Sequence, residues 1–124
     1  MLVISRNRFV NLYLPPLTFA AVIFTLSCFH QLPVPSIDEF SLDKLFHTAA
    51  YTIFGYLIAR ALNQGKNISG KFLAACTILL GAGYGVSDEI HQLFVPGRFF
   101  SYWDMTADFT GAVLGLLLYN KLKR

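Results

Sequence analysis

Four apolar runs of roughly membrane-spanning length constrain this chain more than any other feature. They cover about residues 12–29, 45–62, 72–90 and 105–122 of the 124, and an α-helix needs about 20 mostly apolar residues to cross a bilayer. Apolar residues make up 55% of the chain and charged residues 14%, far from the quarter-charged composition of a soluble domain. The sequence therefore predicts an all-α integral membrane bundle of four transmembrane helices, a single domain over residues 1–124.

The first run allows a second interpretation as a cleaved signal peptide. Arg6 and Arg8 precede it, and it ends at Cys28 in a sequence that only loosely resembles a lipoprotein cleavage site. Because the run is long for a signal sequence, we expect a retained span. Pro15 and Pro16 are expected to kink this helix or delay its start.

The basic residues are distributed unevenly among the predicted connections. Eight of the ten fall on one side of the predicted bundle: Arg6, Arg8, Arg60, Lys66, Lys71, Lys121, Lys123 and Arg124. Because Lys and Arg near span ends mark the cytoplasmic side, both termini are predicted to be cytoplasmic. These residues adjoin apolar runs and leave no separate basic face, so nucleic acid is not expected as a partner.

The acidic residues and histidines all fall on the opposite, outer side. The acidic residues are Asp38, Glu39, Asp43, Asp88, Glu89, Asp104 and Asp108, and the histidines are His30, His47 and His91. Ionisable residues in membrane helices are costly, so they normally face protein or water and pair with each other. The sequence predicts a polar cluster at the outer ends of the last three spans.

The second run opens with DKLFHTAAY. Asp43, His47 and Tyr51 are spaced to share one broad helix face. Lys44 reaches the same cluster or extends toward the headgroups. A lone His is usually a core residue, but Asp43 and Tyr51 share its face, so both the structural and the functional interpretation of His47 stay open at this point.

The third run ends with SDEIHQ. Glu89 and Gln92 share one face of this helix, and Asp88 and His91 share another. We expect Glu89 and Gln92 in the interior and His91 nearer the rim, with the direction of Asp88 left open. Adjacent acids at a helix C-terminus oppose the helix dipole, so a nearby cation has to compensate.

The connection after this run contains a Pro96-Gly97 turn followed by Arg98. Arg98 is expected either to pair with a carboxylate or to hold an anionic phosphate group. Neighbouring aromatic residues suit the headgroup level of a membrane.

The fourth run carries a stripe of acids and glycines. Asp104, Asp108, Gly111 and Gly115 are offset by four, three and four residues, which places them on one helix face. Gly111 and Gly115 form a GxxxG pattern, which lets a second helix approach closely. The stripe predicts a carboxylate-lined cavity between the last three spans.

Two kinds of function fit these residues. An enzyme would use Glu89 or Asp104 with His47 as acid and base, and Arg98 to hold an anionic group. Alternatively, the same residues form an interhelical ion-pair network without catalysis. Asp and His side chains can ligate metals, but no HExxH or Cys/His spacing is present. We therefore assign no metal site and expect no cofactor.

The segments DKLFHTAAY, DEIHQLFVPGR and D-x3-D-x2-G-x3-G together resemble the VanZ-like family of small bacterial membrane proteins, over about residues 38–120. The resemblance implies a set of motif positions: Asp43, Lys44, His47, Tyr51, Asp88, Glu89, Gln92, Arg98, Asp104, Asp108 and Gly111. This chain departs from the family at Phe99 and Phe100, where small polar residues are usual.

The resemblance also implies a multi-pass protein of the bacterial cytoplasmic membrane. The family takes its name from a member associated with resistance to the glycopeptide teicoplanin. We expect an outer polar pocket that acts on envelope lipid or lipid-linked cell-wall material. The alternative is a structural or partner-binding membrane protein, and a homo-oligomer is compatible with either function.

Overall fold

The described part of the chain folds into four helices. The computed structural model describes residues 5–28, 39–97 and 100–123, and of residues 39–42 the backbone only. These segments contain α1 (Arg6–Ser27), α2 (Glu39–Lys66), α3 (Gly70–Gln92) and α4 (Tyr102–Leu122), with no strand in the described residues. Each helix overlaps one predicted apolar run, so the all-α class is confirmed.

Two of the four helices are long and apolar enough to cross a membrane, α1 and α3. The other two, α2 and α4, contain ionisable residues such as His47 and Asp108 and are not among the candidate spans. By length and composition alone, two of the four predicted membrane spans are thus supported.

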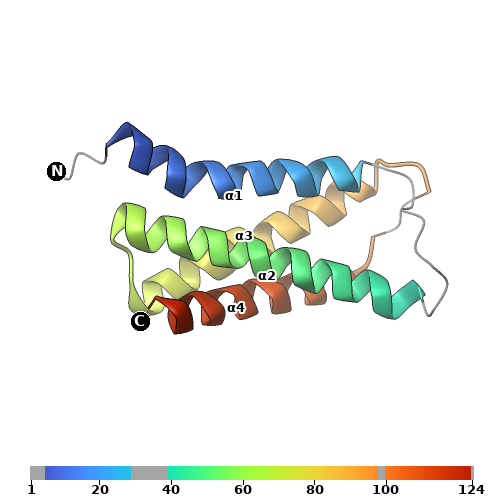
Figure 1. Cartoon of the computed structure of the whole chain (residues 1–124). Coiled ribbons are helices and arrows are strands. Elements are labelled where there is room, and N and C mark those ends of the chain that lie inside the picture. The colour runs from blue at the N-terminus through green and yellow to red at the C-terminus, as the bar shows by residue number, and fades with distance from the viewer. Residues whose placement is uncertain (1–4, 29–38, 98–99, 124) are drawn as a thin grey trace.

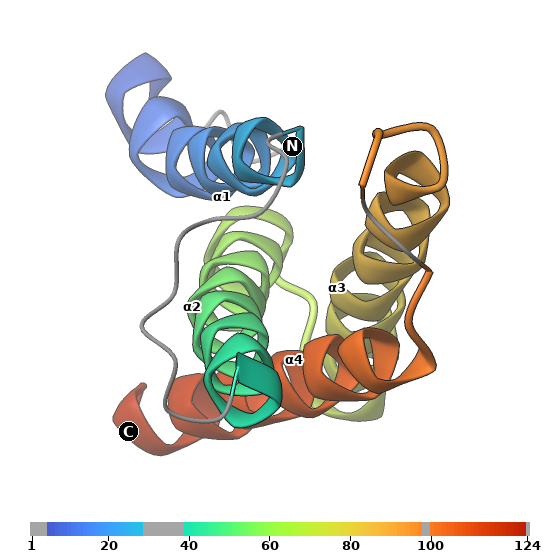
Figure 2. The same cartoon turned by 90° about the vertical axis from the view of Figure 1, so that its right-hand side faces the viewer.

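Consecutive helices run in opposite directions (Figure 1). The start of α1 and the end of α4 therefore lie at one end of the bundle. The starts of α2 and α4 and the ends of α1 and α3 lie at the other, which we call the site end. The end-on view shows α2 between α1 and α4, with α3 alongside (Figure 2).

The largest helix interface joins α2 to α4, and two glycines of α4 allow it. A Cβ atom on Gly111 would lie 2.6 Å from the carbonyl oxygen of Thr48 and 2.7 Å from Cβ of Tyr51. A Cβ on Gly115 would overlap the carbonyl oxygen of Thr52. The GxxxG pattern therefore lies directly against the backbone of α2, and this close approach fixes which residues of the two helices face each other.

The expected delay of the first helix at its proline pair was wrong. Helix α1 begins at Arg6 and continues through Pro15 and Pro16. Proline has no N–H, so Pro15 leaves the carbonyl oxygen of Asn11 without its usual helical donor. Nη1 of Arg60 on α2 donates to that oxygen at 3.1 Å, which replaces the missing hydrogen bond and ties α1 to α2.

Large apolar side chains cover the outside of the bundle, while polar side chains occupy part of its interior. Leu79 is 72% exposed and Leu17 is 67% exposed, whereas Thr77, Glu89 and Asp108 are 0% exposed. Exposed large apolar residues occur on all four helices. The outer surface therefore suits apolar surroundings better than water.

Candidate functional site

Six polar side chains from three helices meet at the site end. The group, which we call the polar cluster, consists of Asp43, Lys44 and His47 of α2, Glu89 of α3, and Asp104 and Asp108 of α4. All six were predicted from the sequence as site residues. Their helices are brought together by the α2–α4 contact at Gly111 and by the packing of α3 against α4.

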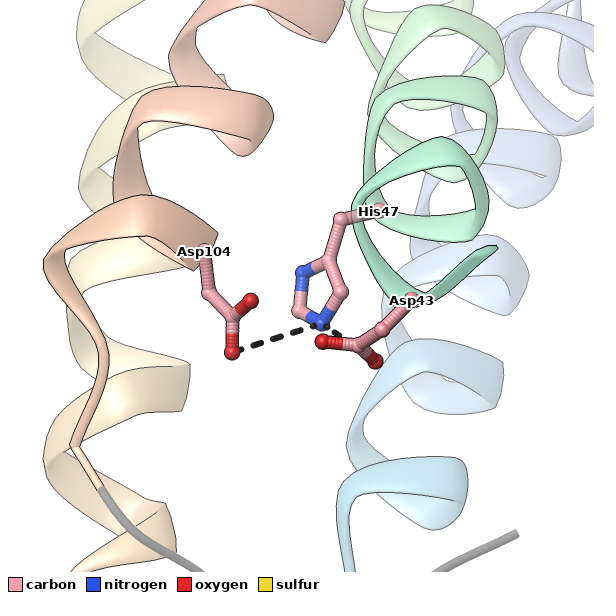
Figure 3. Close-up of side chains that lie close together, drawn as sticks. All are labelled: Asp43, His47 and Asp104. Carbon is pink, nitrogen blue, oxygen red and sulfur yellow. Dashed lines mark ion pairs between the residues drawn. The ribbon is translucent and has the colours of Figure 1, made fainter. Parts of the chain in front are cut away.

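His47 lies at the centre of the polar cluster. Its Nδ1 atom is 2.7 Å from Oδ1 of Asp108. Its Nε2 atom faces two other carboxylates, 3.9 Å from Asp43 and 3.8 Å from Asp104 (Figure 3). Only 13% of the His47 side chain is exposed. Each of the two imidazole nitrogens therefore has at least one carboxylate near it.

Lys44 neutralises the more exposed edge of the polar cluster. Its ammonium group donates to Oδ2 of Asp43 at 2.8 Å and also to Asp104. Burial alone would lower the pKa of Lys44, but the hydrogen bonds to Asp104 and Asp43 outweigh it and the pKa is raised. For Asp43, burial acts to raise the pKa, yet the hydrogen bond from Lys44 and the nearby His47 lower it. Both groups are therefore held in their charged forms.

Glu89 is fully buried and only partly hydrogen-bonded. Its Oε2 atom accepts a hydrogen bond from the backbone N–H of Ser101 at 3.0 Å. Its Oε1 atom is buried and has no hydrogen-bond partner among the described residues. A buried polar atom without a hydrogen-bond partner lowers the free energy of unfolding. The burial of this oxygen therefore destabilises the fold.

Ser101 was missed by the sequence analysis. Its hydroxyl caps α4 by accepting from the backbone N–H of Asp104 at 3.2 Å, while its own N–H holds Glu89. The signal was present in the sequence, because Ser101 is followed three residues later by an acid at the start of an apolar run. One residue therefore caps the backbone of α4 and holds the side chain of Glu89 on α3.

Asp108 is also fully buried, and Gly85 of α3 makes room for it. A Cβ atom on Gly85 would lie 2.8 Å from Oδ2 of Asp108. That oxygen has no hydrogen-bond partner among the described residues, whereas Oδ1 faces His47. Asp108 therefore has one oxygen that contacts His47 and one oxygen without a hydrogen bond among the described residues.

The other predicted site residues have different positions. Tyr51 is 1% exposed and lies one helical turn beyond His47, and Asp88 and Gln92 are buried on α3. His91 turns toward α1, where Nδ1 lies 3.3 Å from the hydroxyl of Ser27. Asp88 is thus buried together with Glu89 and Gln92, and His91 lies outside the polar cluster.

Several sequence predictions concern residues outside the described segments. Arg98, His30 and Asp38 belong to this group, as does the side chain of Glu39. The proposed role of Arg98 in holding an anionic group therefore stays a prediction.

A hollow of about 340 Å³ lies between α3 and α4 on the apolar flank of the bundle. Its lining consists of Ala82, Val86, Tyr102, Met105, Thr106 and Phe109. None of these belongs to the polar cluster. The carboxylate-lined cavity that the sequence suggested stays a prediction.

The polar cluster has the donors for proton transfer and for cation binding. Two groups of three donors each lie within 4.8 Å of one another: Asp43, His47 and Asp104, and His47, Glu89 and Asp108. Carboxylates near an imidazole can exchange protons with a substrate, and both donor types can ligate metals.

The fold and the site together define a class: a small helical bundle with a largely apolar surface and a His–carboxylate cluster buried at one end. The chain belongs to the VanZ/LLP1 family, which it matches over residues 3–123, essentially its whole length. No curated protein and no solved structure matches it significantly. The family resemblance drawn from three sequence segments is therefore confirmed.

Proposed function

We propose that this VanZ-like protein spans the bacterial cytoplasmic membrane four times, with both termini in the cytoplasm, and that its polar cluster acts on envelope lipid or lipid-linked cell-wall material at the outer face. One observation carries the proposal. Glu89 and Asp108 are fully buried, each has an oxygen without a hydrogen bond among the described residues, and both lie near His47.

The distribution of side chains supports the membrane location. Helices α1 and α3 are apolar enough to span, and exposed large apolar residues occur on all four helices. The antiparallel order places most Lys and Arg residues at the end opposite the polar cluster (Figure 1). By the distribution of positive charge, that end is cytoplasmic and the polar cluster faces outward.

The incomplete hydrogen bonding favours a functional site over a purely structural one. A polar network that only holds helices together is most stable when every buried atom is paired. Groups buried at a cost are typical of sites that act on a ligand. In this proposal a ligand bound at the polar cluster supplies the missing partners.

The chemistry proposed for the site centres on His47. Asp108 contacts Nδ1 and holds the ring in one orientation, as a carboxylate does for a catalytic His. Nε2 then exchanges a proton with the substrate, and Asp104 or Glu89 acts as the complementary acid or base. The Nε2 edge lies toward Asp43, whose side chain is 45% exposed, so a headgroup would approach from that side.

The test compares variants at matched membrane levels in a bacterial host that lacks its own copy. Wild type, Glu89→Gln, His47→Gln and the distant control Tyr119→Phe are expressed, and teicoplanin sensitivity and envelope lipid composition are measured. We expect Glu89→Gln and His47→Gln to lose the effect of the wild type on teicoplanin sensitivity or lipid composition, while both variants remain folded and abundant. An effect that only follows protein abundance across all variants would contradict the proposal.

A structural role is the second candidate, and one observation favours it. The contacts of Lys44 with Asp104 and of His47 with Asp108 both join α2 to α4, as an ion-pair network that fixes helix order would. Such a protein would bind partners or a second copy of itself. In that case loss of function and loss of stability would occur together in the same experiment.

A further inference from the structure

We propose that His47, Glu89 and Asp108 form a binding site for one divalent transition-metal cation, with Mn²⁺ and Zn²⁺ as the ions that fit. The inference goes beyond the proposed function because it assigns a ligand to these residues whether or not a lipid is the substrate.

The geometry brings three donors from three helices to one place. One donor atom of each residue lies within 4.8 Å of the other two. Metal–ligand distances of about 2.0 to 2.2 Å place neighbouring donors about 3 to 4 Å apart. Small side-chain rotations, without helix movement, are therefore enough to close the three donors around one ion.

The buried carboxylate oxygens without hydrogen bonds indicate that a positively charged partner is missing. Oε1 of Glu89 and Oδ2 of Asp108 are buried and have no hydrogen bond among the described residues, and both side chains belong to residues that are 0% exposed. Two buried carboxylates side by side are unfavourable unless a cation or a proton neutralises them. A metal ion would satisfy both at once.

The charge of the group suits a divalent cation. Within the described segments, neither Glu89 nor Asp108 forms an ion pair with a Lys or Arg. Two carboxylates, a neutral imidazole and one divalent ion sum to zero charge, which a buried site tolerates best. The other donor group, Asp43 with His47 and Asp104, already has the ammonium of Lys44 on both of its acids.

Surrounding groups orient the donors, as at established metal sites. The N–H of Ser101 holds one oxygen of Glu89 and leaves the other available. Each ring nitrogen of His47 has a carboxylate near it, so one nitrogen can ligate while a carboxylate orients the other.

The donor types narrow the choice of ion. Imidazole favours first-row transition metals, and carboxylates favour harder ions such as Mg²⁺ and Mn²⁺. A mixed set of one imidazole and two carboxylates fits Mn²⁺ or Zn²⁺ better than Mg²⁺. The sequence analysis assigned no metal because the donors come from three separate helices and make no local motif.

The first test uses the full chain, untagged, in detergent. Metal content is measured after exposure to Mn²⁺ or Zn²⁺ and removal of free ion, and melting temperature is measured in chelator and with each ion. We expect about one equivalent bound per chain. At roughly 100 times the dissociation constant, the melting temperature should rise by at least about 5 °C. Less than about a tenth of an equivalent with both ions, and no shift, would overturn the assignment.

Variants then locate the ion. Glu89→Gln removes an anionic ligand at constant shape, and His47→Gln removes the imidazole. Both variants should lose the bound equivalent of metal and the rise in melting temperature. Tyr119→Phe is the matched control because it loses a partly buried hydrogen bond, 2.6 Å to Oδ1 of Asn63, at the opposite end of α4. It should respond to the ion like wild type.

An unchanged ion response in Glu89→Gln and His47→Gln would place the ion elsewhere and overturn the proposal. If these variants do not fold, the chelator and ion titration of the wild type decides. Metal binding without any effect on lipids or teicoplanin sensitivity would leave this site standing and reject the proposed function alone.

Discussion

Nδ1 of His47 on α2 lies 2.7 Å from Oδ1 of Asp108 on α4, and the close approach of the two helices at Gly111 allows this contact. Gly111, three residues after Asp108, lies against the backbone of α2 at Thr48, the residue after His47. A larger side chain there would separate the helices at the level of the pair. The small residues of α4 therefore position the polar cluster as well as the bundle.

Replacement of Gly111 by Ala should destabilise the protein by about 1 to 3 kcal/mol, because the added Cβ overlaps backbone atoms that cannot move freely. Thermal unfolding in detergent measures the loss. Gly83→Ala is the matched control, since a Cβ at Gly83 meets nothing within 4 Å. It should be neutral or stabilising by up to about 1 kcal/mol. Equal effects at both glycines would show that close helix approach is unimportant.

Replacement of Ser101 by Ala removes the cap of α4 and should cost about 0.5 to 2 kcal/mol. The backbone N–H that holds Glu89 remains, so the position of Glu89 should change little. Ser101→Asp should restore the cap, because an Asp side chain also accepts from the helix N–H groups. Thermal unfolding of the two variants tests this, and an Asp variant no more stable than the Ala variant would argue against capping.

Stability should depend on pH through Lys44 and Asp43, which lie just before the apolar run 45–62. The pKa of Lys44 is raised above its ordinary 10.5, so its contribution is full below that pH and is lost as pH rises through the folded-state value. The pKa of Asp43 is lowered from 3.8, so its contribution is present above that pH and is lost as pH falls through the folded-state value.

Lys44→Met should therefore lower the melting temperature most between about pH 4 and 10, and converge on wild type toward both extremes. Lys44→Arg keeps the charge and serves as the matched control, with a profile close to wild type. Melting curves across this pH range test the prediction. Parallel profiles of Lys44→Met and wild type would mean that the ion pairs contribute nothing.

The orientation of the bundle can be tested with its own cysteines. Cys28 is exposed directly after α1 at the site end, whereas Cys76 is half-buried within α3. We expect an impermeant maleimide to label Cys28 in right-side-out membrane vesicles, and Cys28→Ser to abolish this labelling. Labelling of Cys28 only in inverted vesicles would place the polar cluster on the cytoplasmic side.

Much of this fold follows from sequence pattern, since apolar runs and helical spacing indicate which residues share a face. The stripe of Asp104, Asp108, Gly111 and Gly115 predicted which face of α4 turns toward other helices, and in the structure the two glycines of this face pack on α2. Local pattern could not show that Asp108 contacts Nδ1 of His47 while Asp104 shares Lys44 with Asp43, because these pairings depend on how far two helices slide along each other.

The start of α1 shows a second limit of sequence reasoning. A proline pair ordinarily interrupts a helix, but Arg60, a residue 49 positions from Asn11, supplies the missing donor. A contact between distant segments thus outweighed a local preference. The capping role of Ser101 could have been predicted from its sequence pattern, but its backbone contact with Glu89 of α3 could not.

The most direct test of a functional polar cluster is the melting temperature of Glu89→Gln relative to wild type, in the same detergent with chelator present. Glu89 is buried with an unpaired oxygen and no Lys or Arg partner among the described residues. Neutralising it without a change of shape should therefore leave the melting temperature equal or higher. A melting temperature several degrees lower would show that Glu89 stabilises the fold, and would contradict the functional role of the cluster.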